Sequence, residues 1–265
     1  MPKRLIVNAD DYGRTASVSR GIRQAHLQGI VTTTTAMMNF PTAQDDLRVV
    51  MAECPQLGLG VHLVLTAGRP VLPPEQVRSL VTGHGGFPQL SRFEETASQM
   101  DPAELQAEWR AQIEKFLATG AALDHIDSHH HSSYFTETSM GVMLDLANEY
   151  HAPVRNPLSV TEDSGRIANH ARRLLAEKKT PCPTYFYTSF YDNGITLQNL
   201  LAILNSLSDG IAEIMCHPGF VDEDISNNSS YNWQREAEVK VLTAVEVKNA
   251  ILEHKLELTT FRAVI

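Results

Sequence analysis

The feature that most constrains the fold is an alternation of short β-type runs with longer stretches of helical spacing, which continues along the whole chain. The helical stretches carry apolar residues three or four positions apart, as at Val18, Ile22 and Ala25. A strand followed by a helix and another strand favours parallel pairing, because the helix carries the chain back to the starting edge of the sheet. The predicted strands cover residues 4–9, 31–38, 57–65, 123–127, 153–155, 184–188, 211–216 and 256–261.

Chain length narrows the choice of architecture. The 265 residues are close to the roughly 250 that a barrel of eight strand–helix units needs. We therefore predict an α/β fold with a single domain over residues 1–265, a TIM-like (β/α) barrel in regular or distorted form. An open doubly wound sheet is the alternative, because the run at 153–155 is a weak strand candidate.

Two helices have clear sequence signals. Asp101 is a helix N-cap, followed by Pro102 at the first helical position and by Glu104 in a capping-box pattern. Gly120 supplies the left-handed residue that ends this helix. A second long helix is predicted over residues 234–254.

Two stretches break the alternation and predict long loops. Residues 66–99 are rich in Pro and Gly, and residues 220–233 are rich in Asn, Ser and acidic side chains. Long loops in compact domains usually carry function, so we expect both to lie over a functional face.

Charge and cysteine content exclude several classes of function. The chain has 22 basic and 31 acidic residues, a net charge of −9, which disfavours binding to nucleic acid or to an anionic membrane surface. The widely separated Cys54, Cys182 and Cys216 predict buried thiols in a reducing compartment. The first apolar run is too short for a secretory signal, and no run is long enough for a membrane span. We therefore expect a cytoplasmic protein.

Polar residues follow or interrupt the predicted strands. Asp10 and Asp11 come directly after the first strand, where one carboxylate can hold a metal ion while the other accepts a proton; a helix cap with a solvated neighbour is the alternative. His62 lies inside the third strand. Gly58 and Gly60 precede it, and apolar residues follow it. It is either a ligand or a hydrogen-bonded core histidine.

The end of the fourth strand is the most specific local signal. Four histidines fall at His125, His129, His130 and His131, close to Asp127. If the strand continues that far, Asp127, His129 and His131 share one face. Imidazole is the commonest metal ligand, and a nearby carboxylate often orients it. A solvated histidine-rich loop is the alternative, and the roles of His125, His130 and His131 are left open.

His217 completes the candidate site at the end of the seventh strand, before a Pro-Gly turn. Taken alone it could cap the strand, but beside the other residues it is placed to move a proton. One carboxylate and two imidazoles for an ion, together with a free aspartate and a free histidine, are the working set of a metal-assisted hydrolase. The sequence has no Gly-x-Ser-x-Gly elbow and no glycine-rich phosphate loop.

Four motifs in order resemble the YdjC-like carbohydrate deacetylases: NADDYG at 8–13, GVHL at 60–63, DSHHH at 127–131 and MCHPGF at 215–220. The resemblance implies a TIM-like barrel of the glycoside hydrolase/deacetylase type. It also implies removal of an N-acetyl group from a small sugar such as diacetylchitobiose or its 6-phosphate, with release of acetate. By similarity, Asp11, His62 and His129 bind the metal ion, Asp10 is the general base and His217 is the general acid.

Further expectations concern the surroundings of this site. Arg155 is expected to bind a sugar phosphate or substrate oxygen, with a surface salt bridge as the alternative, and Asp127 is expected to orient a metal ligand. The resemblance implies Mg²⁺, whereas two imidazoles and one carboxylate suit Zn²⁺, Mn²⁺, Fe²⁺ or Co²⁺ better. The expected partner is a small acetylated mono- or disaccharide, with or without phosphate, and a homodimer is expected.

Two other functions use the same residues. A sugar-phosphate hydrolase or glycosidase would release phosphate or a monosaccharide and no acetate. A non-catalytic metal or sugar sensor would bind without turnover, but it gives Asp10 and His217 no reason to lie beside the ligands.

Overall fold

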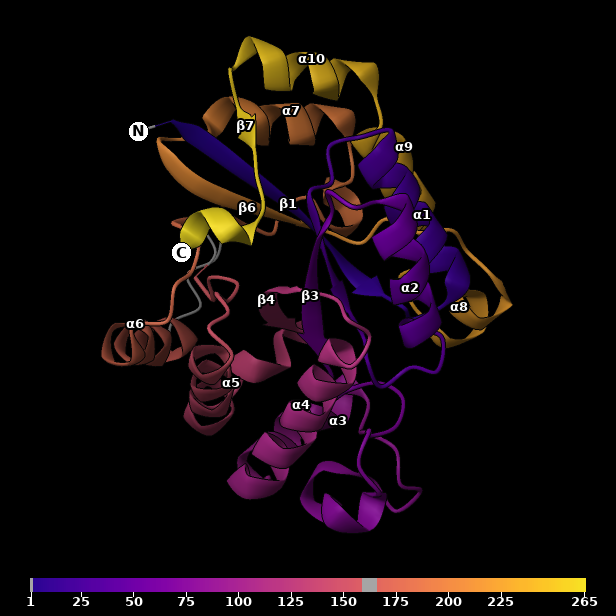
Figure 1. The fold of residues 1–265 in the computed structure, drawn as a ribbon, viewed down its shortest axis with the longest axis vertical. Coiled ribbons are helices and arrows are strands. Elements are labelled where there is room, and N and C mark those ends of the chain that lie inside the picture. Colours follow the sequence, from indigo (N-terminus) through magenta and orange to yellow (C-terminus); the bar gives the residue numbers. More distant parts are fainter. Residues whose placement is uncertain (1, 159–165) are drawn as a thin grey trace.

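The computed structural model describes residues 2–158 and 166–265, and in them a parallel sheet curls into a half-barrel with helices around it (Figure 1). The strand order is β4-β3-β2-β1-β6-β5, and β7 pairs with the first residues of β1. This is the distorted TIM-like barrel that the strand–helix alternation predicts. The strands are β1 (Lys3–Tyr12), β2 (Thr33–Ala36), β3 (Gly58–Leu63), β4 (Leu123–Ser128), β5 (Tyr185–Tyr187), β6 (Gly210–Cys216) and β7 (Glu257–Leu258).

The helices cover the outside of the sheet and bury its outward-facing side chains. Parallel strands covered on both faces are buried along their length, and β1 is buried without interruption from Leu5 to Tyr12. The helices are α1 (Ala16–Leu27), α2 (Ala43–Glu53), α3 (Leu90–Thr96), α4 (Pro102–Leu117), α5 (Glu137–Glu149), α6 (Arg166–Lys178), α7 (Leu197–Ser206), α8 (Glu223–Asn228), α9 (Trp233–Leu242) and α10 (Val245–Glu253).

Helix α4 begins and ends where the sequence predicts. The Asp101 carboxylate accepts hydrogen bonds from the amides of Ala103 and Glu104, and Gly120 has φ +85° beyond the helix end. The capping box is only half formed, because the Glu104 carboxylate accepts from Ser79 instead of reaching back to Asp101. The amide of Asp101 donates to Ser79 Oγ. The cap therefore also anchors the long segment that precedes the helix.

The predicted helix over residues 234–254 is wrong as one element. It is two helices, α9 and α10, separated at Thr243 and Ala244. Ala244 has an extended backbone, with ψ 142°, and Thr243 Oγ1 donates to the carbonyl of Val239 in the last turn of α9. Such a side-chain bond competes with the helical pattern.

The predicted strand at 153–155 is reduced to one isolated bridge between Val154 and Ile126 of β4. Pro153 has no amide hydrogen to donate, and the amide of Val154 donates to the Pro181 carbonyl instead of extending a ladder. The described part of the sheet therefore has no regular strand between β4 and β5. The missing strand is what distorts the barrel. Arg155, which follows the bridge, has a fully buried side chain.

The two predicted loops contain structure of their own. Residues 66–99 hold α3 and three short 3₁₀ turns, and residues 220–233 hold α8. Glu108 of α4 is fully buried and accepts from the amides of Val71 and Leu72 at 2.8 and 3.0 Å. The first loop is therefore tied to the barrel through a buried carboxylate.

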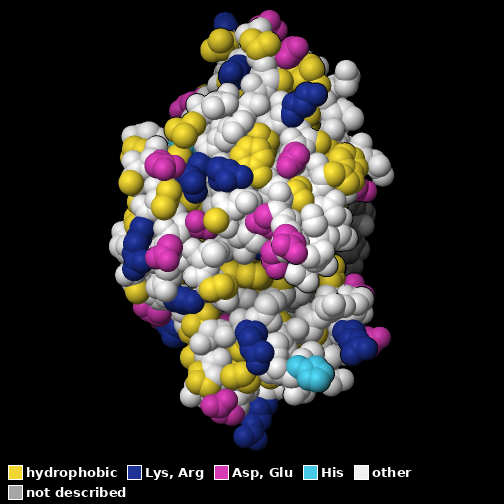
Figure 2. Space-filling model, turned by 90° about the vertical axis from the view of Figure 1, so that its right-hand side faces the viewer, with side chains coloured by type: hydrophobic (Ala, Val, Ile, Leu, Met, Phe, Trp, Pro, Cys, Tyr) yellow, Lys and Arg dark blue, Asp and Glu magenta, His cyan; other side chains and the backbone are white. Residues whose placement is uncertain are grey.

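One face of the molecule shows how the charged side chains are distributed (Figure 2). On the face that Figure 2 shows, basic side chains are scattered among acidic and apolar ones, without the continuous basic stripe typical of nucleic-acid-binding proteins. Among the described residues, no helix is both long and apolar enough to cross a membrane.

Candidate metal and catalytic site

The site begins at an irregularity in β1. The register with β2 shifts between Ala9 and Tyr12, and Asp11 has a left-handed backbone with φ +72°. Bulges of this kind redirect side chains at strand ends, and a strained aspartate backbone is a recurrent mark of a functional position. As a result, the adjacent carboxylates of Asp10 and Asp11 have different partners.

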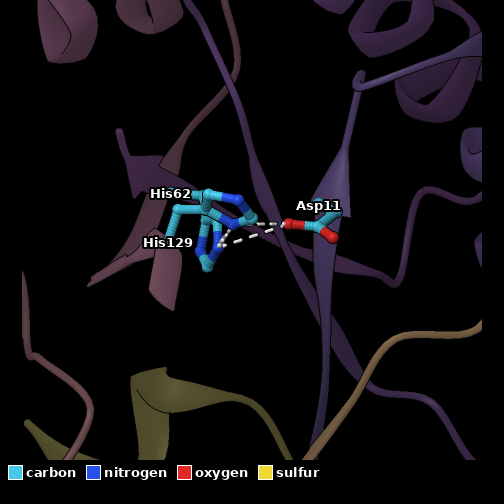
Figure 3. A group of neighbouring side chains, drawn as sticks. All are labelled: Asp11, His62 and His129. Atoms are coloured by element: carbon cyan, nitrogen blue, oxygen red, sulfur yellow. Dashed lines mark hydrogen bonds and ion pairs between the residues drawn. The ribbon is translucent and has the colours of Figure 1, made fainter. Parts of the chain in front are cut away.

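Asp11, His62 and His129 converge from three strand ends (Figure 3). Asp11 Oδ1 lies 3.5 Å from His62 Nε2 and 3.0 Å from His129 Nδ1, and the two nitrogens are 3.3 Å apart. An ion with ligand bonds of about 2.0–2.1 Å holds its ligand atoms about 3.3 Å apart in a tetrahedral set and about 3 Å apart in an octahedral one. The triangle therefore has the size of a divalent-ion site in either geometry.

The protonation of this triangle also fits an ion. Asp11 Oδ1 is buried and makes no hydrogen bond with any described residue, which is costly unless a cation faces it. Burial opposes ionisation, but the guanidinium of Arg235 lowers the pKa of Asp11, which lies well below its usual range. Burial lowers the pKa of His129, so its imidazole is neutral, as a metal ligand must be.

Asp127 fixes the orientation of His62. The two residues are directly paired across β3 and β4, and His62 Nδ1 lies 2.6 Å from Asp127 Oδ1. Burial alone would lower the pKa of His62, but Asp127 and the neighbouring carboxylates raise it to about 9 in the absence of an ion. A carboxylate on Nδ1 directs Nε2 toward the metal position. The contact between Asp127 and His62 Nδ1 has the geometry expected of a carboxylate that orients a histidine ligand.

Asp10 is clamped by Arg155. Arg155 NH1 and NH2 donate to the two carboxylate oxygens of Asp10 at 2.8 and 2.7 Å, and the side-chain amide of Asn8 donates to Asp10 Oδ1 at 2.8 Å. Burial opposes ionisation, but the guanidinium holds the pKa of Asp10 well below its usual range. Asp10 is therefore an ionised carboxylate held in a fixed orientation.

Arg155 differs from both sequence expectations. Its guanidinium is 0% exposed and also pairs with Glu213 Oε1 at 2.7 Å and Asp127 Oδ2 at 3.0 Å, so it is not a surface salt bridge. It presents no surface to a sugar. We infer that Arg155 positions Asp10 instead of contacting substrate.

His217 lies across from Asp10, at the carboxyl end of β6. Its Nε2 is 3.7 Å from Asp10 Oδ2, and its backbone amide donates to the carboxylate of Glu238 in α9. The Nδ1 atom is buried and has no hydrogen-bond partner among the described residues. Burial lowers the pKa of His217 to about 4. The imidazole is therefore neutral at neutral pH before the reaction begins.

Helix α9 connects the two halves of the site through residues to which the sequence alone assigns no role. Arg235 is 2% exposed; its NH2 donates to Asp11 Oδ2 at 2.6 Å and its NH1 to the carbonyl of His217 at 3.4 Å. Glu238 is fully buried and accepts from the hydroxyl of Tyr231 as well as from His217. Their spacing of three residues places Arg235 and Glu238 on one helix face, but the sequence does not show that this face is buried.

A cavity of about 280 Å³ opens onto Asp10, His129 and His217. His130 and His131 line it as well, but not as members of a continued strand, because β4 ends at Ser128 and both residues have φ +54°. The expected shared face of Asp127, His129 and His131 is therefore wrong.

His125 lies apart from the cavity. Its ring stacks on Phe261 at 3.8 Å, and its Nδ1 pairs with Asp124 at 3.2 Å. It is a packed histidine of the barrel interior.

Comparison with known proteins gives a consistent result over the whole chain. The family model described as YdjC-like protein matches residues 4–253. The chain is 38% identical to a carbohydrate deacetylase of Thermoanaerobacter pseudethanolicus, with 98% of each chain covered. It is 33% identical to a carbohydrate deacetylase of Vibrio cholerae, with 99% of this chain and 96% of the relative covered.

The solved structures agree in fold. A crystal structure from Enterococcus faecalis, named as a candidate cellobiose-phosphate cleavage protein, superposes with a TM-score of 0.91 at 37% identity, with 99% of each chain covered. The Xyl-CE4 domain of a multidomain xylanase from the hindgut metagenome of Trinervitermes trinervoides superposes with a TM-score of 0.52 at 9% identity, with 100% of this chain and 90% of that one covered. The second likeness shows a shared fold only.

Proposed function

The chain belongs to the YdjC-like family, and we propose that it is a metal-dependent hydrolase that removes an N-acetyl group from a small acetylated sugar and releases acetate. The substrate we propose is diacetylchitobiose or its 6-phosphate. The observation that carries the proposal is one cavity lined by Asp10, His129 and His217, in which His129 also belongs to the Asp11–His62–His129 triangle. The relatives named carbohydrate deacetylase support the acetylated sugar.

The residues divide the chemistry as follows. Asp11, His62 and His129 would hold a divalent ion, which when bound supplies Lewis-acid polarisation of the acetamide carbonyl and of water. Asp10, held in place by Arg155, accepts the proton of the attacking water. His217 Nε2 is 3.7 Å from Asp10 Oδ2, so this proton can pass to the imidazole and from there to the departing amine. The products are acetate and a free amino sugar.

Acetate release is the direct test. Metal-stripped protein is resupplied separately with Mg²⁺, Zn²⁺, Mn²⁺ and Co²⁺ and assayed on diacetylchitobiose and its 6-phosphate. We expect acetate with at least one ion and none from His62→Ala. Asp10→Asn should lower kcat by about 10²–10⁴-fold, whereas Asp45→Asn, which alters an exposed carboxylate on α2, should leave it unchanged.

The possible results separate the assignments. An Asp10→Asn variant with wild-type turnover and bound metal would show that the base is another group, and His217→Ala tests the acid in the same way. Absence of acetate with every ion and both sugars would refute the deacetylase proposal. The metal preference in this assay decides between Mg²⁺, which the family resemblance implies, and the transition metals that the ligand set favours.

The name of the Enterococcus faecalis relative also calls for assays of phosphate and monosaccharide release. A carboxylate-pair glycosidase needs one carboxylic acid with a raised pKa. Here, despite burial, the neighbouring cations hold the pKa of both Asp10 and Asp11 well below the usual range. This favours acetate release over glycosidic cleavage. A cytoplasmic homodimer stays a prediction, and light scattering of the purified protein tests the dimer.

A further inference from the structure

One wall of the cavity carries an aromatic ring that the proposed chemistry does not use. Tyr191 lines the cavity beside His217, with ring centroids 5.5 Å apart, and 45% of its surface is exposed. Single exposed aromatic residues are common on protein surfaces. The argument therefore depends on the place of this ring and on what holds it there.

One face of the Tyr191 ring is backed by a second aromatic ring, while 45% of the residue is exposed. It stacks on Tyr231 with centroids 4.7 Å apart and an interplanar angle of 9°. Tyr231 is only 8% exposed, and its hydroxyl donates to the buried Glu238. The stacked face is therefore fixed against the interior, and the exposed surface of Tyr191 belongs to its edge and its opposite face.

The backbone around Tyr191 is also fixed. The amide of Gly194 donates to the Tyr191 carbonyl at 2.8 Å, and Gln234 of α9 donates to the Asp192 carboxylate at 3.2 Å. Asn199 of α7 donates to the carbonyl of Ser189 at 2.9 Å. The ring is thus preorganised before any ligand arrives, which reduces the entropy lost on binding.

Pyranose rings have an apolar face of C–H groups, and a flat aromatic face that is already held in place is the surface that complements it. Resting on the proposed function, we propose that Tyr191 is the binding platform for the sugar ring that carries the acetamide. That ring lies on the free face of Tyr191, with its nitrogen directed to His217. The cavity of about 280 Å³ is slightly smaller than the roughly 300–1,000 Å³ of most ligand sites, so one ring fills it and a second ring extends toward solvent.

Kinetics and direct binding test the platform separately. In the metal-loaded enzyme, Tyr191→Ala should raise KM for diacetylchitobiose by about tenfold, with kcat within about threefold of wild type. Tyr191→Phe keeps the ring and should leave KM within about twofold. Trp233→Ala removes an aromatic side chain that is 63% exposed and is not among the cavity-lining residues, and it should leave both constants unchanged.

Calorimetry of diacetylchitobiose binding to Asp10→Asn, and to the same variant carrying Tyr191→Ala, measures the platform without turnover. We expect Kd to rise about tenfold in the double variant. An unchanged Kd and KM would overturn the platform, and so would a loss confined to kcat, which would assign Tyr191 to positioning His217. If the sugar binds through Tyr191 but the wild-type enzyme releases no acetate, the platform stands and the proposed function fails.

Discussion

Asp127→Asn is the substitution that tests the metal site most directly, because it exchanges one oxygen for an NH₂ group without changing the size of the side chain. Asp127 Oδ1 lies 2.6 Å from His62 Nδ1, and Oδ2 lies 3.0 Å from Arg155 NH1. If the new amide side chain kept its oxygen toward His62, its NH₂ group would face Arg155 NH1, and two hydrogen-bond donors would meet. We therefore expect the amide to turn its oxygen to Arg155 and its NH₂ group to His62.

The turned amide reverses the tautomer of His62. Nδ1 becomes the acceptor, so the proton moves to Nε2, the atom that faces Asp11 Oδ1 at 3.5 Å. A protonated nitrogen cannot bind an ion. Loss of a partner that orients a metal ligand usually lowers metal affinity by about 10- to 100-fold, or about 1.4–2.7 kcal/mol. Because the tautomer is also wrong, we expect the upper end of this range.

Isothermal titration of metal-stripped protein with the preferred ion measures the affinity. Asp124→Asn is the matched control, since Asp124 lies on the same strand and pairs with His125 at 3.2 Å. His125 stacks on Phe261 away from the cavity, so this variant should bind the ion as the wild type does. Wild-type affinity in Asp127→Asn, or an equal loss in both variants, would refute the reasoning.

Two further predictions concern packing and pH. A Cβ atom at Gly21 would lie 2.5 Å from the Cα of Gly219, in the turn after His217, so Gly21→Ala should lower the free energy of unfolding by about 1–3 kcal/mol. Gly141→Ala, with no atom within 4 Å of the new Cβ, should raise it by about 0.5–1 kcal/mol, and urea titrations with equal effects would contradict the packing argument. Burial, opposed by Arg155, raises the pKa of Glu213 from 4.5 to about 7, so its stabilising contribution is complete below pH 4.5 and is lost as the pH rises through 7. The unfolding free energy of the wild type should therefore fall by up to about 3 kcal/mol relative to that of Glu213→Gln from pH 4.5 to 8, and a constant difference would show that the pKa of Glu213 is not raised.

The sequence predicts that the polar residues of the site lie close together, because this prediction needs only one geometric rule. The carboxyl ends of parallel strands share one edge of the sheet, so polar residues that end different strands meet there. This rule predicts a cluster of polar residues without any knowledge of the pairing register, and the family resemblance then identifies Asp11, His62 and His129 as the expected metal ligands. It does not extend to His130 and His131, whose left-handed backbone ends the strand period.

The partners of the site residues could not be predicted in the same way. Arg155 follows a strand that fails to form, and its guanidinium reaches Asp10 only because the barrel is irregular there. Arg235 and Glu238 lie on a helix that comes late in the chain, and sequence spacing does not show which face of that helix meets the strand ends. Such contacts depend on how the whole barrel closes.

Two adjacent buried carboxylates would repel each other and lose their hydration, so Asp10 and Asp11 need separate compensation. The bulge in β1 turns the two side chains apart, and each then meets its own arginine from a distant segment. Arg155 occupies both oxygens of Asp10, whereas Arg235 approaches Oδ2 of Asp11 and leaves Oδ1 facing the two imidazoles. A helix cap with a solvated neighbour would need neither arginine. The two contacts of Arg155 leave no oxygen of Asp10 for an ion, whereas the single contact of Arg235 leaves Oδ1 of Asp11, and for this reason we propose Asp11 and not Asp10 as the metal ligand.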